Sequence, residues 1–151
     1  MTFLPGNKTV RIVALVLRLA LGAVFIYAAW AKLGEPWAVF AVAIDSFQIL
    51  PLWGVEFVAR TLPWFELAVG ALLISGRWLH ISATASSLLL LVFFGLLLRA
   101  QLKGMPIQCG CFGPDEPLSW KTVMRDGALL SSSLLITALT FRARLKIPQT
   151  H

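Results

Sequence analysis

The fold is decided by the stretch from Leu79 to Leu98, which reads LHISATASSLLLLVFFGLLL. These 20 residues carry no formal charge, and Arg99 and Lys103 follow them. As a helix rising ~1.5 Å per residue they would extend about 30 Å, which is the thickness of the hydrocarbon core of a bilayer. The stretch therefore predicts a transmembrane helix.

The composition of the whole chain points to the same environment. Hydrophobic residues make up 58% of the 151 residues and charged residues only 13%, whereas an ordinary soluble domain carries about 25% charged residues. The net charge of +6 comes from basic residues that flank apolar runs, a pattern typical of anchoring at lipid headgroups. We therefore expect a lipid bilayer, and no nucleic acid, as the partner of this surface.

Three further apolar segments are candidates for membrane spans. Residues 12–31 are interrupted only by Arg18, residues 57–75 contain Glu66, and residues 123–141 carry their charges near the start. With residues 79–98, these segments predict an all-α membrane protein. We expect a four-transmembrane-helix bundle that forms a single domain over residues 1–151.

The first apolar segment also has features of a signal peptide. Basic residues precede it, and Ala29-Trp30-Ala31 has the pattern of a cleavage site. Its apolar run is longer than the ~7–15 residues of a signal peptide, and more spans follow. We expect it to be retained as the first span.

Residues 36–53 form a weaker apolar segment between the first two spans. Asp45, Ser46 and Gln48 interrupt it, and Pro51 follows Leu50. A full span would place Asp45 near the bilayer centre, so the segment indicates a short amphipathic helix at the interface.

Four spans would place both termini on one side of the membrane. The basic residues divide evenly between the two sides, so the positive-inside rule does not decide the orientation by count. The cluster of Arg142, Arg144 and Lys146 favours cytoplasmic termini. The loop of residues 104–118 would then lie outside the cytoplasm, where disulfides persist.

That loop contains the only two cysteines of the chain, Cys109 and Cys111, separated by Gly110. A disulfide across one residue requires a sharp bend, which glycine permits. Strain makes such a bridge easier to reduce, so the pair suits disulfide exchange. Two alternatives remain open: a bridge that only stiffens the loop, and a metal site, for which no nearby His or further Cys supplies the other ligands.

Two pairs of charged residues are further candidates. Glu66 lies inside a predicted span, where a carboxylate must face protein, water or a cation. Lys32 ends the first span on the same predicted side, so the two can pair, either as a structural clamp or as a proton relay or quinone contact. Arg125 and Asp126 can pair near the cysteine loop.

The order of several motifs resembles the MauE/DoxX family of redox-associated membrane proteins. The resemblance covers roughly Arg18 to Leu139. The residues that carry it are Ala31-Lys32-Leu33, Pro36, Phe40 and Leu50-Pro51, then Leu62-Pro63-Trp64-Phe65-Glu66-Leu67 with Gly70, then Cys109-Gly110-Cys111-Phe112-Gly113, Leu118-Ser119-Trp120 and Arg125-Asp126.

This resemblance implies a multi-pass protein of the bacterial cytoplasmic (inner) membrane with its cysteines on the periplasmic side. Cys109 and Cys111 would be the redox pair, and Glu66 and Lys32 would be membrane-embedded polar positions. The implied activity is thiol–disulfide exchange with a periplasmic thioredoxin-like partner. It would support maturation of an extracytoplasmic protein such as the disulfide-rich subunit of methylamine dehydrogenase.

Two other functions fit the same residues. The bundle could be a non-enzymatic membrane assembly factor whose cysteines only shape a docking loop. It could also be a quinone-linked subunit of the DoxX type, with Glu66 at the quinone. No cofactor other than a quinone is implied.

Overall fold

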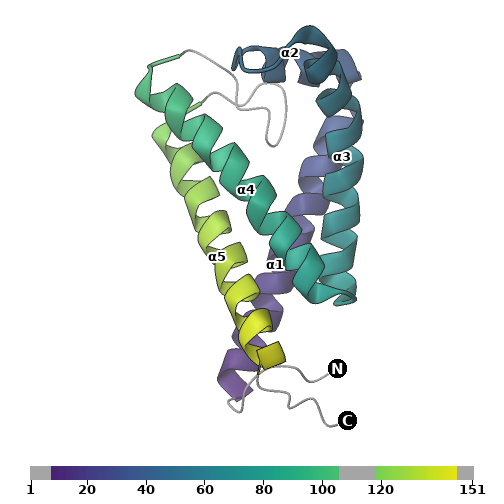
Figure 1. Ribbon diagram of the computed structural model, residues 1–151, viewed down its shortest axis with the longest axis vertical. Helices are drawn as coiled ribbons and strands as arrows, with labels where there is room; N and C mark the ends of the chain where they lie inside the picture. The colour runs from purple at the N-terminus through teal and green to yellow at the C-terminus, as the bar shows by residue number, and fades with distance from the viewer. Residues whose placement is uncertain (1–7, 106–117, 146–151) are drawn as a thin grey trace.

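The computed structural model describes residues 8–105 and 118–145. Within these residues the chain forms helices and no strand, so the predicted all-α fold is confirmed (Figure 1). The helices are α1 (Lys8–Leu33), α2 (Trp37–Asp45), α3 (Leu52–Ser75), α4 (Leu79–Leu102) and α5 (Trp120–Leu145).

Three helices of the described part, α1, α3 and α4, are long and apolar enough to cross a membrane. Helix α5 is as long as α1, at 26 residues each. It is less apolar because it contains Arg125, Asp126 and the serines at 131–133. The first three predicted spans are thus supported, whereas the fourth stays a prediction.

Large apolar side chains are exposed along the helices. Ile12 on α1, Phe57 on α3 and Val92 on α4 each expose 60% or more of their surface. All six tryptophans are exposed as well. Soluble proteins rarely present such extended apolar surface, so lipid is the environment that these faces fit.

The helix bounds between α1 and α3 differ from those expected from the sequence. The helix expected within residues 36–53 ends at Asp45, and Gln48 adopts a positive φ of 50° in the turn that follows. Helix α3 then begins at Leu52, earlier than the predicted start near Phe57, because the carbonyl of Pro51 accepts hydrogen bonds from Gly54 and Val55. The membrane-interface position of α2 stays a prediction.

The long helices form two pairs, α1 with α3 and α4 with α5 (Figure 1). The start of α1, the end of α5 and the α3–α4 turn lie at one end of the bundle, which we call the turn end. There α3 closes at Gly76, whose left-handed φ of 69° suits glycine. Arg18 lies against this turn, since a Cβ on Gly76 would come within 2.8 Å of its Nη1.

Both helix pairs contribute to the main core. Leu21 and Phe25 of α1 pack with Leu73 of α3, Ala83 of α4 and Ile136 of α5. Helices α1 and α3 approach closely at Gly22 and Gly70, where a Cβ on Gly70 would lie 2.9 Å from the carbonyl oxygen of Gly22. Small residues permit this contact between backbones.

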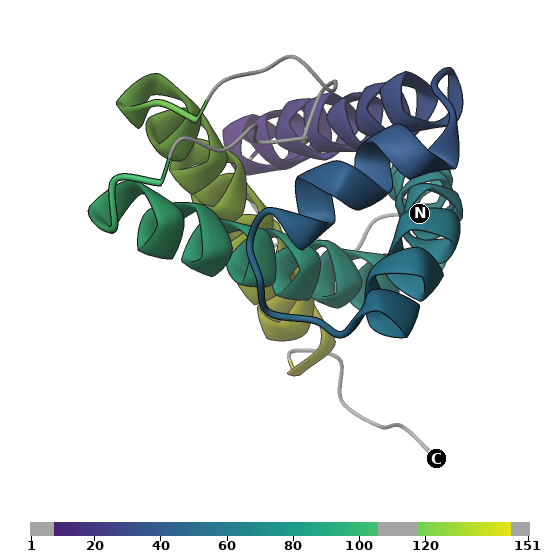
Figure 2. The same ribbon diagram turned by 90° about the horizontal axis from the view of Figure 1, so that it is seen from above.

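At the opposite end, which we call the α2 end, α3 and α4 lie far apart (Figure 1). Helix α2 covers the region between α1, α3 and α4 when the bundle is viewed from that end (Figure 2). Its Phe40 and Ala43 pack on Ala59 of α3. Phe47, just beyond α2, packs on Leu97 and Ala100 of α4. The α2 segment thus fills the space that the diverging helices leave.

Candidate functional site

The central feature of the candidate site is a buried ion pair between Lys32 of α1 and Glu66 of α3. The Lys32 Nζ donates to both carboxylate oxygens of Glu66, at 2.7 Å each. The two side chains are only 3% and 6% exposed. The pairing expected from the sequence is therefore confirmed, while a catalytic role for either residue stays a prediction.

The ion pair joins the interior of α3 to the end of α1, where Lys32 is the penultimate residue. Glu66 is about 21 Å along α3 from its first residue and about 14 Å from its last, at ~1.5 Å per residue. An unpaired charged group at the centre of a membrane helix would cost roughly 2.5–3.5 kcal/mol on insertion scales. Pairing with Lys32 offsets this cost, because each charge supplies the partner that lipid cannot.

Aromatic rings surround the ammonium on its other sides. The Lys32 Nζ lies 5.1 Å from the ring centroid of Phe40 on α2 and 5.5 Å from that of Phe93 on α4. Both distances are within the range of cation–π attraction. Lys32 therefore contacts elements from three parts of the fold: α2, α3 and α4.

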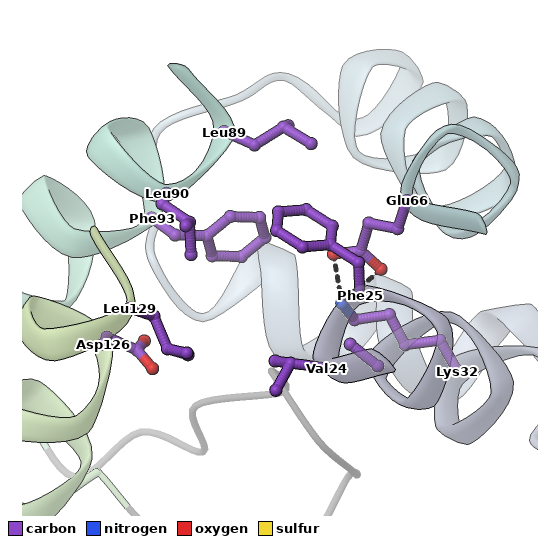
Figure 3. Close-up of a pocket in the computed structure, with 10 residues that line it drawn as sticks. Val24, Phe25, Lys32, Glu66, Leu89, Leu90, Phe93, Asp126 and Leu129 are labelled. Atoms are coloured by element: carbon purple, nitrogen blue, oxygen red, sulfur yellow. Dashed lines mark hydrogen bonds and ion pairs between the residues drawn. The ribbon is translucent and has the colours of Figure 1, made fainter. Parts of the chain in front are cut away.

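A small cavity of about 40 Å³ adjoins the pair. Its walls include Val24 and Phe25 of α1, Phe93 of α4 and Asp126 of α5. Figure 3 shows Asp126 facing the cavity from the side opposite Glu66, with the rings of Phe25 and Phe93 between them. The volume has room for water but not for a larger molecule.

Asp126 is held at the start of α5, as its sequence position suggested. Arg125 Nε donates to Asp126 Oδ1 at 3.4 Å, and the aspartate side chain is 6% exposed. Ser119 caps the helix: its Oγ accepts from the Thr122 N–H at 3.4 Å. The structure thus brings Lys32, Glu66 and Asp126 to one cavity, and Arg125 contacts Asp126.

Sequence reasoning missed a hydroxyl network that joins α4 to α5. Ser133 is fully buried and its Oγ lies 2.8 Å from both Ser86 Oγ and Ser87 Oγ. Ser87 also contacts Thr137 at 3.0 Å. The recurrence of hydroxyl residues at helical spacing within apolar segments was the signal that could have revealed it.

The cysteine pair, Cys109 and Cys111, lies outside the described residues, as does most of the predicted loop 104–118. The helix ends that flank this segment, Leu102 of α4 and Trp120 of α5, are both at the α2 end (Figure 1). Among the described residues, no three His, Cys, Asp or Glu side chains gather as a metal site would require.

Apolar helices with an ion pair sealed inside them define a multi-pass helical membrane protein. Residues 10–139 match the family described as methylamine utilisation protein MauE. The match spans most of the chain, which therefore belongs to the MauE family. Neither a curated protein nor a solved structure was found to match the chain.

Proposed function

We propose that this protein is a membrane thiol–disulfide redox protein that uses Cys109 and Cys111. Membership in the MauE family links it to methylamine utilisation. The observation that carries the proposal is the position of the cysteine pair. The only two cysteines stand one residue apart, inside the matched region, in the segment that joins α4 to α5.

The proposed reaction is exchange with a periplasmic thioredoxin-like protein. A thiolate of one dithiol attacks the disulfide of the other protein and forms a mixed disulfide, which the second thiol then resolves. Two electrons and two protons pass from dithiol to disulfide, so one pair is oxidised as the other is reduced. The client would be an extracytoplasmic protein that needs disulfides, with the disulfide-rich subunit of methylamine dehydrogenase as the candidate.

This reaction requires the segment between α4 and α5 to lie outside the cytoplasm. We propose that α5 is a fourth span and that the termini are cytoplasmic, in the inner membrane of a bacterium. The polar groups of α5 support a membrane position. Asp126 and Ser133 are buried, and the exposed hydroxyls of Ser131 and Ser132 donate to the carbonyls of Gly127 and Ala128. Hydroxyl groups that form their hydrogen bonds within their own helix are tolerated in lipid.

Trapping of thiols in cells tests the proposed exchange. Cys109→Ser and Cys111→Ser are each expressed in the native host, the cells are quenched with acid and alkylated, and disulfide-linked species are identified by mass spectrometry. One single variant should accumulate a mixed disulfide with a thioredoxin-like protein, because the resolving thiol is missing. The double serine variant is the control.

The proposal fails if no mixed disulfide forms and both serine variants keep their function in the host. A partner that co-purifies equally well with the double serine variant, in cells that keep that function, would identify the chain as an assembly factor whose cysteines are dispensable.

A further inference from the structure

Arg18 of α1 lies half-buried at the turn end and has an unsatisfied hydrogen-bond donor. Its guanidinium group lies against the α3–α4 turn, because a Cβ on Gly76 would come within 2.8 Å of Nη1 and 3.4 Å of Nη2. The Arg18 Nε is buried and forms no hydrogen bond among the described residues. Buried donors without a partner are rare in native proteins. The guanidinium is therefore placed to bind an acceptor that these residues do not supply.

The charge of the surrounding surface shows what kind of acceptor fits. Residues 8–34, 67–105 and 127–145 contain no Asp or Glu. These ranges include the start of α1, the α3–α4 turn and the end of α5, which meet at the turn end (Figure 1). The basic residues of these three parts are Lys8, Arg11, Arg18, Arg77, Arg142 and Arg144. Because no carboxylate of the described residues balances them there, an anion is the complementary ligand.

The α3–α4 turn is at the level that lipid headgroups occupy in a membrane. Helices α3 and α4 have 24 residues each, so each is about 36 Å long at ~1.5 Å per residue, slightly more than the ~30 Å of a hydrocarbon core. Trp78 in the turn exposes 69% of its surface, as tryptophans at a membrane interface do. The guanidinium of Arg18, which contacts this turn, is therefore at the level of the phosphate groups.

Apolar side chains flank the turn on the two helices that it joins. Ile74 of α3 and Ile81 of α4 expose 39% and 50% of their surfaces, and both helices are apolar enough to cross a membrane. A ligand with a phosphate at Arg18 and acyl chains along these residues matches both the charge and the apolar surface. An acidic protein segment would match only the charge.

We propose that the turn end binds an anionic phospholipid whose phosphate oxygens accept hydrogen bonds from the guanidinium of Arg18, with Arg77 as a second contact. The planar fork of a guanidinium matches two phosphate oxygens at once. A headgroup with a net negative charge binds better than a zwitterionic one, because the described residues at this end offer no carboxylate to an ammonium group. This lipid site is separate from the proposed thiol exchange.

Native mass spectrometry of the purified full-length protein, released from detergent micelles, tests the site. The probes are phosphatidylglycerol and phosphatidylcholine with identical acyl chains, and inorganic phosphate is the competitor. The first phosphatidylglycerol should bind about fivefold or more tightly than phosphatidylcholine, as a difference of ~1 kcal/mol would give. Equal binding of the two lipids, or displacement of the lipid by millimolar phosphate, would overturn the proposal.

Three substitutions separate the site from the overall charge of the protein. Arg18→Gln should weaken phosphatidylglycerol binding about tenfold, as a loss of ~1.4 kcal/mol would. Arg77→Gln removes an exposed charge that cannot disturb the core, and should weaken binding about fivefold. Arg99→Gln removes the same charge near the opposite end of α4 and should leave binding within about twofold.

The role of the guanidinium is tested with Arg18→Lys, which keeps the charge and loses the fork. It should bind phosphatidylglycerol better than Arg18→Gln and less tightly than the unchanged protein. Equal losses in Arg18→Gln, Arg77→Gln and Arg99→Gln would mean that only net charge attracts the lipid, and would overturn the site. Lipid binding unchanged by Arg18→Gln and Arg77→Gln, with loss of a co-purifying acidic protein, would also overturn it in favour of a protein partner.

Discussion

The turn end and the α2 end of this bundle share the long helices, but these helices meet differently at the two ends, and α2 lies only at the second (Figure 1). At the turn end, Leu21, Leu73 and Ala83 are at most 2% exposed, and α1 touches α3 backbone to backbone at Gly22 and Gly70. Beyond this region α3 and α4 separate, with an apolar groove between them (Figure 1). The Lys32–Glu66 ion pair joins α1 to α3 beside a small cavity that α4 and α5 also line. A tightly packed region thus supports another in which charged groups are held in fixed positions.

The largest effect is expected from breaking the buried ion pair. Glu66→Leu leaves the Lys32 ammonium without a counter-charge and should reduce the free energy of unfolding by about 3–5 kcal/mol. The measurement is unfolding of the purified protein by sodium dodecyl sulfate in mixed micelles. The double variant Lys32→Met/Glu66→Met should recover most of this loss, since it leaves no unpaired charge.

A second ion pair on α3 serves as the control. Glu56 and Arg60 are joined at 2.6 Å, yet their side chains are 52% and 55% exposed. Glu56→Gln should change the free energy of unfolding by only about 0.3–0.5 kcal/mol, as expected for an exposed pair one helical turn apart. Equal losses of unfolding free energy for the two pairs would show that burial does not increase the cost of breaking the Lys32–Glu66 pair.

A smaller effect is expected where the helices touch at the turn end. Gly70→Ala places a Cβ 2.9 Å from the Gly22 carbonyl oxygen, so α1 and α3 must separate. The loss should be about 1–3 kcal/mol, typical of overpacking. Gly95→Ala on α4 is the matched control because a Cβ there meets nothing within 4 Å. A Gly70→Ala protein as stable as Gly95→Ala would refute the close contact.

The smallest effect concerns the hydroxyl network between α4 and α5. Ser133→Ala removes the common partner of Ser86 and Ser87 and should cost about 0.6 kcal/mol, with ~1.7 kcal/mol as the upper end for such bonds in membranes. Ser131→Ala, which removes a hydroxyl bonded only to its own helix, should be nearly neutral. The same unfolding titration compares the two.

Several features of the fold could be predicted from the sequence because they depend on local patterns. The uncharged run at 79–98 became α4, and Ser119 became the cap of α5. Glu66 could be paired with Lys32 in advance because an intramembrane carboxylate requires a cation and few were within reach. The prediction of this pair needed only the approximate position of each residue along its span.

Other features could not be predicted because they depend on how helices diverge and rotate. The groove beside Phe93 exists because α3 and α4 separate beyond Gly76, and no sequence period encodes that angle. The start of α3 at Leu52 was also missed, because that helix begins directly after Pro51 and not with the apolar run from Phe57. The role of Cys109 and Cys111 stays a prediction, since the structure describes neither.

The accessibility of that cysteine pair tests the central claim of the account most directly. Intact cells are treated with a mild reductant that stays outside and then with a membrane-impermeant maleimide. The account predicts that Cys109 and Cys111 are labelled in intact cells only after reduction, as a periplasmic disulfide would be. Labelling that appears only after the cells are lysed, with both thiols already reduced, would contradict it.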